Sequence, residues 1–182
     1  ILDEGLTIKS SLKEAQLSQM DVLAQAIYDS MDYPAPAVHE EAKPVEQNAM
    51  FSLSYGLYVL TARDGEKDNG CIINTVMQQT DTPKRISITV NKANYTCDMI
   101  KKTGVFNVSV LSQDAPFAMF QHYGFQSGRD VDKFAGFAWA RDINGVPYVT
   151  EQCAARFACT VVNEVDLGTH ILFVARVDDS VS

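Results

Sequence analysis

Residues Cys153–Val177 read CAARFACTVVNEVDLGTHILFVARV. Two runs rich in β-branched and aromatic residues, Cys153–Val165 and His170–Val177, flank the short segment Asp166-Leu167-Gly168. Side chains of this kind favour strands, and the glycine favours a turn between them. The segment therefore predicts two successive β-strands near the end of the chain.

Similar strand patterns precede this segment. Val105–Leu111 alternates, with Val108 and Val110 on one face. Further strands are predicted at Phe51–Thr61, Cys71–Met77 and Ile86–Val90, with turns at Arg63-Asp64-Gly65 and Asn144-Gly145. Only short helices are predicted between them, at Asn94–Lys102 and Ala115–Tyr123, and Gly124–Phe137 is predicted to be irregular. Many strands and few helices predict a mainly β fold, an antiparallel barrel, in which closure removes exposed strand edges.

The first 48 residues have a different composition. Ser11-Leu12-Lys13-Glu14 fits a capping box, and apolar residues then recur at helical spacing up to Met31. The stretch 33–48 contains three prolines and is typical of a linker. We therefore expect an N-terminal helix in residues 1–32, a linker at 33–48 and the β domain at 49–182. Because Ile1 is not a start methionine, we also expect a piece of a longer protein.

Composition excludes several functional classes. The 182 residues carry a net charge of −8, with 46% hydrophobic residues, so a disordered chain is excluded and no basic stripe for nucleic acid is seen. No apolar run is long enough for a transmembrane helix. The four cysteines, Cys71, Cys97, Cys153 and Cys159, lack CxxC spacing, and reduced thiols in a cytoplasmic protein are expected. The three histidines lack metal-ligand spacing, and no GxSxG, P-loop or GxGxxG motif occurs.

Four segments could carry chemistry, and each also has a purely structural explanation. In Asn69–Thr80 an apolar strand passes into short polar groups, which suits the edge of a planar ligand or simply a strand entering a loop. Asn91–Thr96 lies where a strand gives way to a helix, whose N-terminus suits a phosphate, although Asn94 could be an ordinary cap. Ser127–Phe134 could wrap a phosphate or be a solvated loop, and His170 in Gly168–Phe173 could face a ligand or end a strand.

In this order the four segments resemble the flavin reductase-like family of FMN-binding split barrels, over about Met50–Asp178. Gly168-Thr169-His170-Ile171-Leu172-Phe173 is similar to the family's Gly-Asp-His-Thr-Leu-Phe strand, from which Thr169 and Ile171 depart. The resemblance implies an antiparallel split β-barrel, a homodimer with FMN near the interface, and hydride transfer from NADH or NADPH to the flavin.

The resemblance also implies roles for single residues. Asn74, Thr75, Val76 and Met77 would contact the isoalloxazine ring. Six residues and a glycine would hold the phosphate side of FMN: Lys92, Tyr95, Thr96, Ser127, Gly128, Arg129 and Lys133. His170 would lie near the ring and act in catalysis, and no metal is implied. Residues 1–32 also resemble the end of a flavodoxin-like domain, although a helix belonging to the barrel domain is an equal alternative.

Three functions remain open from sequence. The first is an NAD(P)H-dependent FMN reductase that passes electrons to a flavodoxin-like, rubredoxin or di-iron partner. The second is an FMN-bound electron carrier of the flavoredoxin kind, without significant NAD(P)H turnover. The third is a split barrel that binds a cofactor or dimerises without redox chemistry. The sequence favours the first two because both the ring and phosphate segments are present. It does not distinguish NADH from NADPH, or bound FMN from FMN as a substrate.

Overall fold

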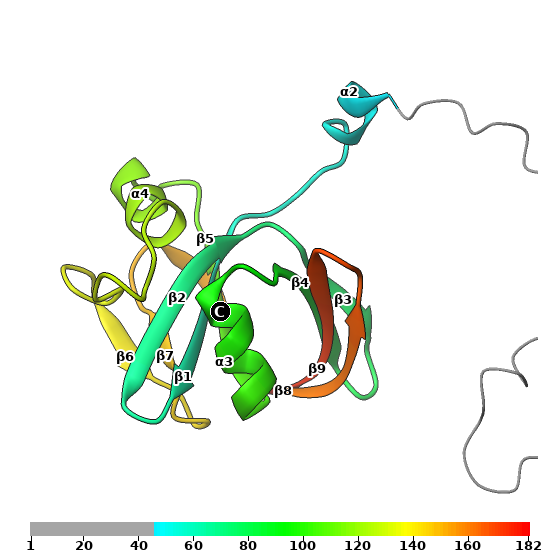
Figure 1. The fold of residues 1–182 in the computed structure, drawn as a ribbon. Helices are drawn as coiled ribbons and strands as arrows, with labels where there is room; N and C mark the ends of the chain where they lie inside the picture. The colour runs from blue at the N-terminus through cyan, green and yellow to red at the C-terminus, as the bar shows by residue number, and fades with distance from the viewer. Residues whose placement is uncertain (1–45) are drawn as a thin grey trace, which may run out of the picture. The chain divides into compact units, whose positions relative to one another are not determined.

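Seven antiparallel strands form one sheet in the order β2-β1-β5-β8-β9-β4-β3. Their bounds are β1 (Tyr58–Asp64), β2 (Lys67–Ile73), β3 (Val76–Thr80), β4 (Arg85–Asn91), β5 (Val105–Leu111), β8 (Cys153–Asp166) and β9 (His170–Val181). Figure 1 shows this sheet curling around helix α3 (Tyr95–Thr103). Strands β2 and β3 are the two ends of the order, so the barrel is split between them. The predicted mainly β, antiparallel split barrel is confirmed.

The computed structural model describes residues 46–182. The predicted helix at 11–31 and residues 33–45 of the predicted linker lie outside the described residues. The described part begins with the short helix α2 (Gln47–Met50) and an irregular stretch at 51–57. A strand starting at Phe51 was therefore a wrong prediction. The segment has no partner strand before Tyr58, and Phe51 is 83% exposed, so its apolar residues do not mark a buried strand.

Helix α3 packs against the interior of the barrel. The side chain of Asn94 caps its start by accepting a hydrogen bond from Thr96 N (3.0 Å), and Gly104 ends it with a left-handed backbone (φ 71°). Cys97, Met99 and Ile100 point from the helix into the core, where they pack with apolar side chains of the strands. The helix predicted at Asn94–Lys102 is confirmed, and its start is fixed beside the ends of β2 and β4.

The hairpin of β8 and β9 forms as predicted. Leu167 N donates to His170 O (2.9 Å), and Gly168 takes a positive φ of 86°. Strand β9 runs on to Val181, beyond the predicted end at Val177, because its last residues pair with the start of β8. The register between β8 and β9 shifts twice along β8, between Ala158 and Cys159 and between Val161 and Asn163.

The predicted strand Cys71–Met77 is two strands in the structure. Strand β2 pairs with β1, whereas β3 pairs with β4 at the other end of the sheet order, so the chain must leave one pair to join the other. The break falls at residues 74–75. Thr75 Oγ1 donates to Thr89 O (2.7 Å) on β4 and holds the chain where β3 begins.

The rest of the described chain adds helix α4 (Phe117–Gly124) and a small hairpin of β6 (Trp139–Arg141) and β7 (Pro147–Val149). Gly145 closes the turn of this hairpin with φ 76° and donates to Asp142 O (2.9 Å), as its Asn-Gly sequence predicted. Between α4 and β6 the chain is irregular, again as predicted. Among residues 46–182, no helix has the length and apolarity to cross a membrane.

Candidate functional site

One cavity, which we call cavity A, lies where the middle of β2 meets the start of α3 and the loop after α4. Its volume is about 320 Å³. Strand β2 contributes Asn69–Cys71, the junction before α3 contributes residues 91 and 93–95, and the end of α4 with the following loop contributes residues 123–129 and Lys133. The N-terminus of α3 thus faces a cavity with the positive end of the helix dipole, which favours an anion, although the N–H groups of Thr96 and Cys97 already donate to Asn94.

Two residues that line cavity A each carry a buried polar atom with no hydrogen-bond partner among residues 46–182: Asn69 at Oδ1 and Tyr123 at its hydroxyl. Both residues are about 1% exposed. Burial raises the pKa of the Tyr123 phenol, which therefore stays protonated and able to donate. Because a buried polar atom without a partner is unfavourable, the pair indicates a polar ligand in the cavity.

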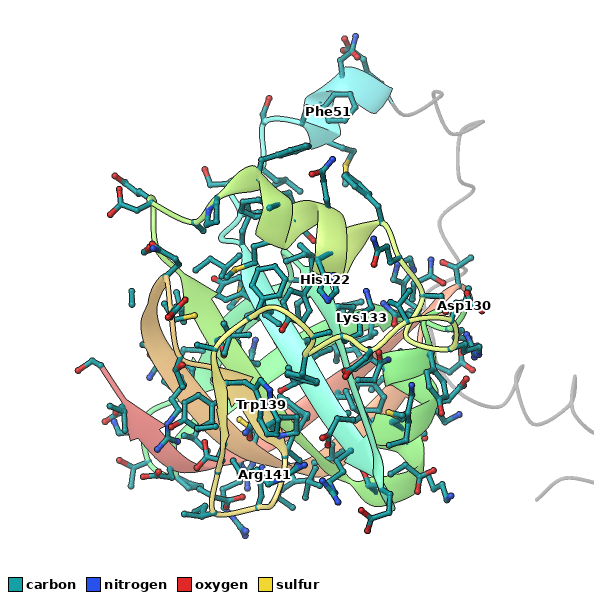
Figure 2. All side chains as sticks on the ribbon, turned by 90° about the vertical axis from the view of Figure 1, so that its left-hand side faces the viewer. Phe51, His122, Asp130, Lys133, Trp139 and Arg141 are labelled. Atoms are coloured by element: carbon teal, nitrogen blue, oxygen red, sulfur yellow. The ribbon has the colours of Figure 1, made fainter. Side chains whose placement is uncertain are left out.

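Lys133 supplies a buried positive charge at cavity A. Its Nζ donates to His122 O (2.6 Å) and Tyr123 O (3.2 Å), near the end of α4, and the ammonium has a third N–H. Figure 2 shows Lys133 beside His122, on the loop that follows the helix. Burial lowers the pKa of Lys133. No carboxylate forms an ion pair with Lys133 within the described residues, so an anionic ligand would complete its surroundings.

The loop at 127–129 approaches β2 very closely. A Cβ atom placed on Gly128 would lie 1.7 Å from Asn69 Oδ1, so any larger residue would have to displace the Asn69 side chain. Asn69 is held in turn by Thr96, whose Oγ1 accepts from Asn69 Nδ2 (3.0 Å). Gly128 and Thr96 therefore set the position of the unpartnered Asn69 oxygen.

A second hollow, cavity B, has a volume of about 520 Å³. Its walls are the segment 53–56, Tyr58, residues 74–77 and 79, Ser87, Thr89 and Leu172. Thr89 in cavity B and Asn91 in cavity A are two residues apart on β4, so their side chains share one face about 6.6 Å apart. An extended ligand that follows this face of β4 could occupy both cavities.

The structure divides the predicted site residues among three places. Tyr95, Ser127, Gly128, Arg129 and Lys133 line cavity A. Asn74, Thr75, Val76 and Met77 line cavity B. Lys92, Thr96 and His170 line neither cavity, and Thr96 is completely buried.

Two of the predicted phosphate-binding cations are engaged by carboxylates. Lys92 Nζ lies 2.6 Å from Asp166 Oδ1, and Arg129 donates to Asp98 (2.9 Å) while its guanidinium stacks over the Tyr95 ring at 4.5 Å. Lys133 is the one predicted phosphate-binding cation that forms no ion pair with a carboxylate of residues 46–182. Asn69, although part of a segment singled out from the sequence, was not predicted as a ligand, and Tyr123 had no sequence pattern that separated it from an ordinary core residue.

His170 begins β9 opposite Asn91 of β4. It shares a strand face with Leu172, a residue of cavity B, while Ile171 points into the core. Its Nδ1 lies 2.8 Å from Thr169 Oγ1, and its side chain is half-buried. His170 therefore lies on the same face of the sheet as cavity B, but it does not line that cavity.

Comparisons with known proteins agree with this architecture. The high molecular weight rubredoxin of Moorella thermoacetica is 37% identical over 136 residues, 75% of this chain and 59% of that protein. The ferric-chelate reductase (NAD(P)H) of Archaeoglobus fulgidus is also 37% identical over 136 residues, which cover 80% of it. The crystal structure of flavoredoxin from Methanosarcina acetivorans superposes with a TM-score of 0.67 at 22% identity, over 79% of this chain and 76% of that one. This chain thus spans less than two thirds of the rubredoxin relative.

The family model described as the flavin reductase like domain matches residues 50–181, nearly the whole described barrel. The match covers the strands, helix α3 and the loop that together form cavities A and B. The chain therefore belongs to the flavin reductase like domain family.

Proposed function

We propose that this chain is an FMN-binding oxidoreductase that transfers hydride from NADH or NADPH to flavin and passes the electrons to a redox partner. The observation that carries the proposal is cavity A, beside the N-terminus of α3, whose lining includes Asn69, Tyr123 and Lys133, three residues whose side chains retain unused hydrogen-bonding capacity. Donors and a positive charge at a helix start suit a phosphate group. Family membership and the names of the two relatives support the same chemistry.

The residues of the two cavities fit the two ends of FMN. In cavity A, Lys133 and Tyr123 would donate to the phosphate, and the positive end of the α3 dipole would add to the attraction. A phosphate carries no donor when fully ionised, so Asn69 Oδ1 would instead accept from a hydroxyl of the ribityl chain. In cavity B, residues 74–77 would flank the isoalloxazine ring, and Thr75 is already fixed by its bond to Thr89. When bound, FMN supplies the ring that accepts and releases the electrons.

The proposal gives indirect roles to three further residues, Lys92, Thr96 and Arg129. Thr96 would act through Asn69, which it holds at 3.0 Å. Lys92 and Arg129 would have to leave Asp166 and Asp98 to reach a phosphate, or else add only to the local positive potential. Ser127 Oγ accepts from Arg129 N (3.2 Å) and shapes the loop around Gly128.

The nicotinamide nucleotide would stack on the flavin ring and be held weakly, because the sequence has no GxGxxG motif for a dedicated dinucleotide site. His170, on the face of the sheet that carries cavity B, would orient the nicotinamide or the acceptor. Its Nδ1 contact with Thr169 leaves Nε2 available for that purpose.

Partners and location follow the same proposal. A rubredoxin, flavodoxin-like or di-iron module would take the electrons, and the name of the Moorella relative supports the first of these. A homodimer would place two flavin sites at one interface. All four cysteines are free, with Cys71, Cys97 and Cys159 buried, which supports a reducing, cytoplasmic setting.

An anaerobic absorbance titration tests the proposal. The purified chain is loaded with FMN, and NADH and then NADPH are added without oxygen. Bleaching of the bound flavin at a rate that supports turnover is expected. A bound flavin that neither nucleotide bleaches would leave an FMN-bound electron carrier instead. Failure of FMN to bind would contradict both functions.

A further inference from the structure

A third hollow, cavity C, lies at the end of the barrel where β4 begins, away from cavity A. Its volume is about 450 Å³. Most of its wall is apolar, with Tyr58, Val110, Phe157 and Val177 contributed by β1, β5, β8 and β9. Lys84 and Arg85 form the basic part of the wall. A cavity of this size with a small number of polar groups is typical of a site for a small molecule.

Arg85 differs from the other arginines of the described chain. Five of the six form ion pairs with carboxylates: Arg63, Arg129, Arg141, Arg156 and Arg176. Arg85 forms none with residues 46–182, although the protein as a whole is acidic. Its side chain is half-buried, and its Nε is buried without a hydrogen-bond partner. Because its Nε is buried without an acceptor and no carboxylate among residues 46–182 neutralises its charge, Arg85 can still bind an anion.

The neighbouring charges leave one positive charge in excess. Arg85 lies directly opposite Arg176 on β9, and like charges in that relation repel. Arg176 is neutralised by Asp178 (2.6 Å), and Lys84 by Asp81 (2.7 Å). Among residues 46–182, three cations therefore face two carboxylates at this end of the barrel, and Arg85 is the cation without a carboxylate partner.

We propose that cavity C binds a small organic carboxylate, with its apolar body between Tyr58, Val110 and Phe157 and its carboxylate on Arg85. A single negative charge matches the single excess positive charge. The planar guanidinium group can donate two parallel hydrogen bonds to a carboxylate. The apolar wall favours a ligand with an aromatic or aliphatic body over a simple inorganic anion.

Strand β3 separates this site from cavity B. Its side chains alternate, so Gln78 faces cavity C while Met77 and Gln79 face cavity B, and Val76 borders both. A ligand in cavity C would therefore contact β3, the strand that would also flank the flavin ring. This coupling rests on the proposed FMN site, whereas carboxylate binding itself does not.

The test is isothermal titration of the full chain with 3-phenylpropionate and octanoate, and with 3-phenylpropionamide as the uncharged match. At least one carboxylate should bind, and its amide should bind about tenfold more weakly or worse. Arg85→Gln should weaken carboxylate binding by a similar factor. Arg176→Gln, which removes the opposite but already paired arginine, should change it by less than about twofold.

Two controls keep the outcomes distinct. Methyl NMR shifts should concentrate at Val110 and Val177, and shifts at Leu53 and Leu172 instead would place the ligand in cavity B and overturn the proposal. Arg85→Lys, which keeps the charge but cannot donate two parallel hydrogen bonds, should bind with intermediate affinity, whereas a loss equal to that in Arg85→Gln would argue against a role for the charge. Absence of binding by both carboxylates, or equal loss in Arg85→Gln and Arg176→Gln, would also overturn it. FMN affinity, measured on the same samples, reports on the proposed function separately.

Discussion

Lys133 and His122 are joined by two hydrogen bonds that run in opposite directions. Lys133 Nζ donates to His122 O (2.6 Å), and His122 Nε2 donates to Lys133 O (3.0 Å). The pair ties the loop after α4 back onto the end of that helix. As a result, a buried ammonium is held at the wall of cavity A, where the C-terminal carbonyl groups of α4 partly stabilise its charge.

Lys133→Met should weaken binding of FMN by about tenfold or more, because a charge-assisted bond to phosphate contributes roughly 1.5–3 kcal/mol. Riboflavin, which lacks the phosphate, should bind equally to both proteins, and this comparison separates lost charge from altered folding. Lys102→Met, at an exposed lysine paired with Asp64, is the matched control. Fluorescence titration with both flavins measures the effect.

The same lysine predicts a pH dependence. Burial places the pKa of Lys133 below its usual value of 10.5, so the ammonium is lost at a lower pH than in an ordinary lysine. Preference for FMN over riboflavin should be present at neutral pH and fall as pH rises through that lowered pKa. A preference that stays constant up to pH 10.5 in the wild type would contradict the role of Lys133.

Tyr123→Phe should have opposite effects on the empty and the loaded protein. Removing a buried hydroxyl without a partner should leave the free energy of unfolding unchanged or raise it by about 1 kcal/mol. FMN affinity should fall, because the phenol would no longer donate to the phosphate. Denaturant unfolding and FMN titration measure the two quantities. Tyr148→Phe, outside both flavin cavities, should leave FMN affinity unchanged; a drop there equal to that in Tyr123→Phe would argue against a specific donor.

Gly128→Ala should disturb cavity A far more than Gly124→Ala, although both glycines line it. The new Cβ at residue 128 would meet Asn69 Oδ1 at 1.7 Å and must displace it, whereas at residue 124 the nearest atom is 3.6 Å away. We expect FMN affinity to drop about tenfold or more in the first variant and less than about threefold in the second. Equal affinities would show that the loop yields without affecting the ligand.

Thr96→Ala combined with Lys92→Ala should weaken FMN binding, and the single variants divide the effect. Thr96→Ala removes the acceptor that holds Asn69, so it should account for most of the loss. Lys92→Ala breaks an exposed pair with Asp166 that contributes little to stability, because solvent screens it. Thr96→Ser should retain wild-type affinity. An unchanged FMN affinity in the double variant would refute the phosphate assignment of this segment.

His170→Ala should slow reduction of bound FMN by NADH or NADPH and leave FMN affinity intact, because the histidine lies beyond the walls of both flavin cavities. Anaerobic stopped-flow measurement of flavin bleaching gives the rate. Thr169→Val, which removes the contact to Nδ1 but keeps the ring, should produce a smaller decrease. Normal rates with both nucleotides in His170→Ala would assign the residue a structural role.

The sequence by itself determined most strands of the barrel, the start and end of α3, and the two turns at Gly145 and Gly168, but it predicted one strand at Cys71–Met77 where the structure has two. These features depend on local preferences: alternation of side chains, an Asn cap, and glycines where the backbone takes a positive φ. The apolar stretch at Phe51 was wrongly predicted as a strand, because composition alone does not reveal whether a partner strand exists.

Only the tertiary structure decided which polar groups meet. Asn69 is far along the chain from Tyr123 and Lys133, and the three residues meet because β2, α4 and the following loop pack together at one end of α3. Lys92 and Arg129, equally basic in sequence, are instead neutralised by Asp166 and Asp98. The free energy of a charge or a hydroxyl depends on burial and on its neighbours in space, and neither is encoded in spacing along the chain.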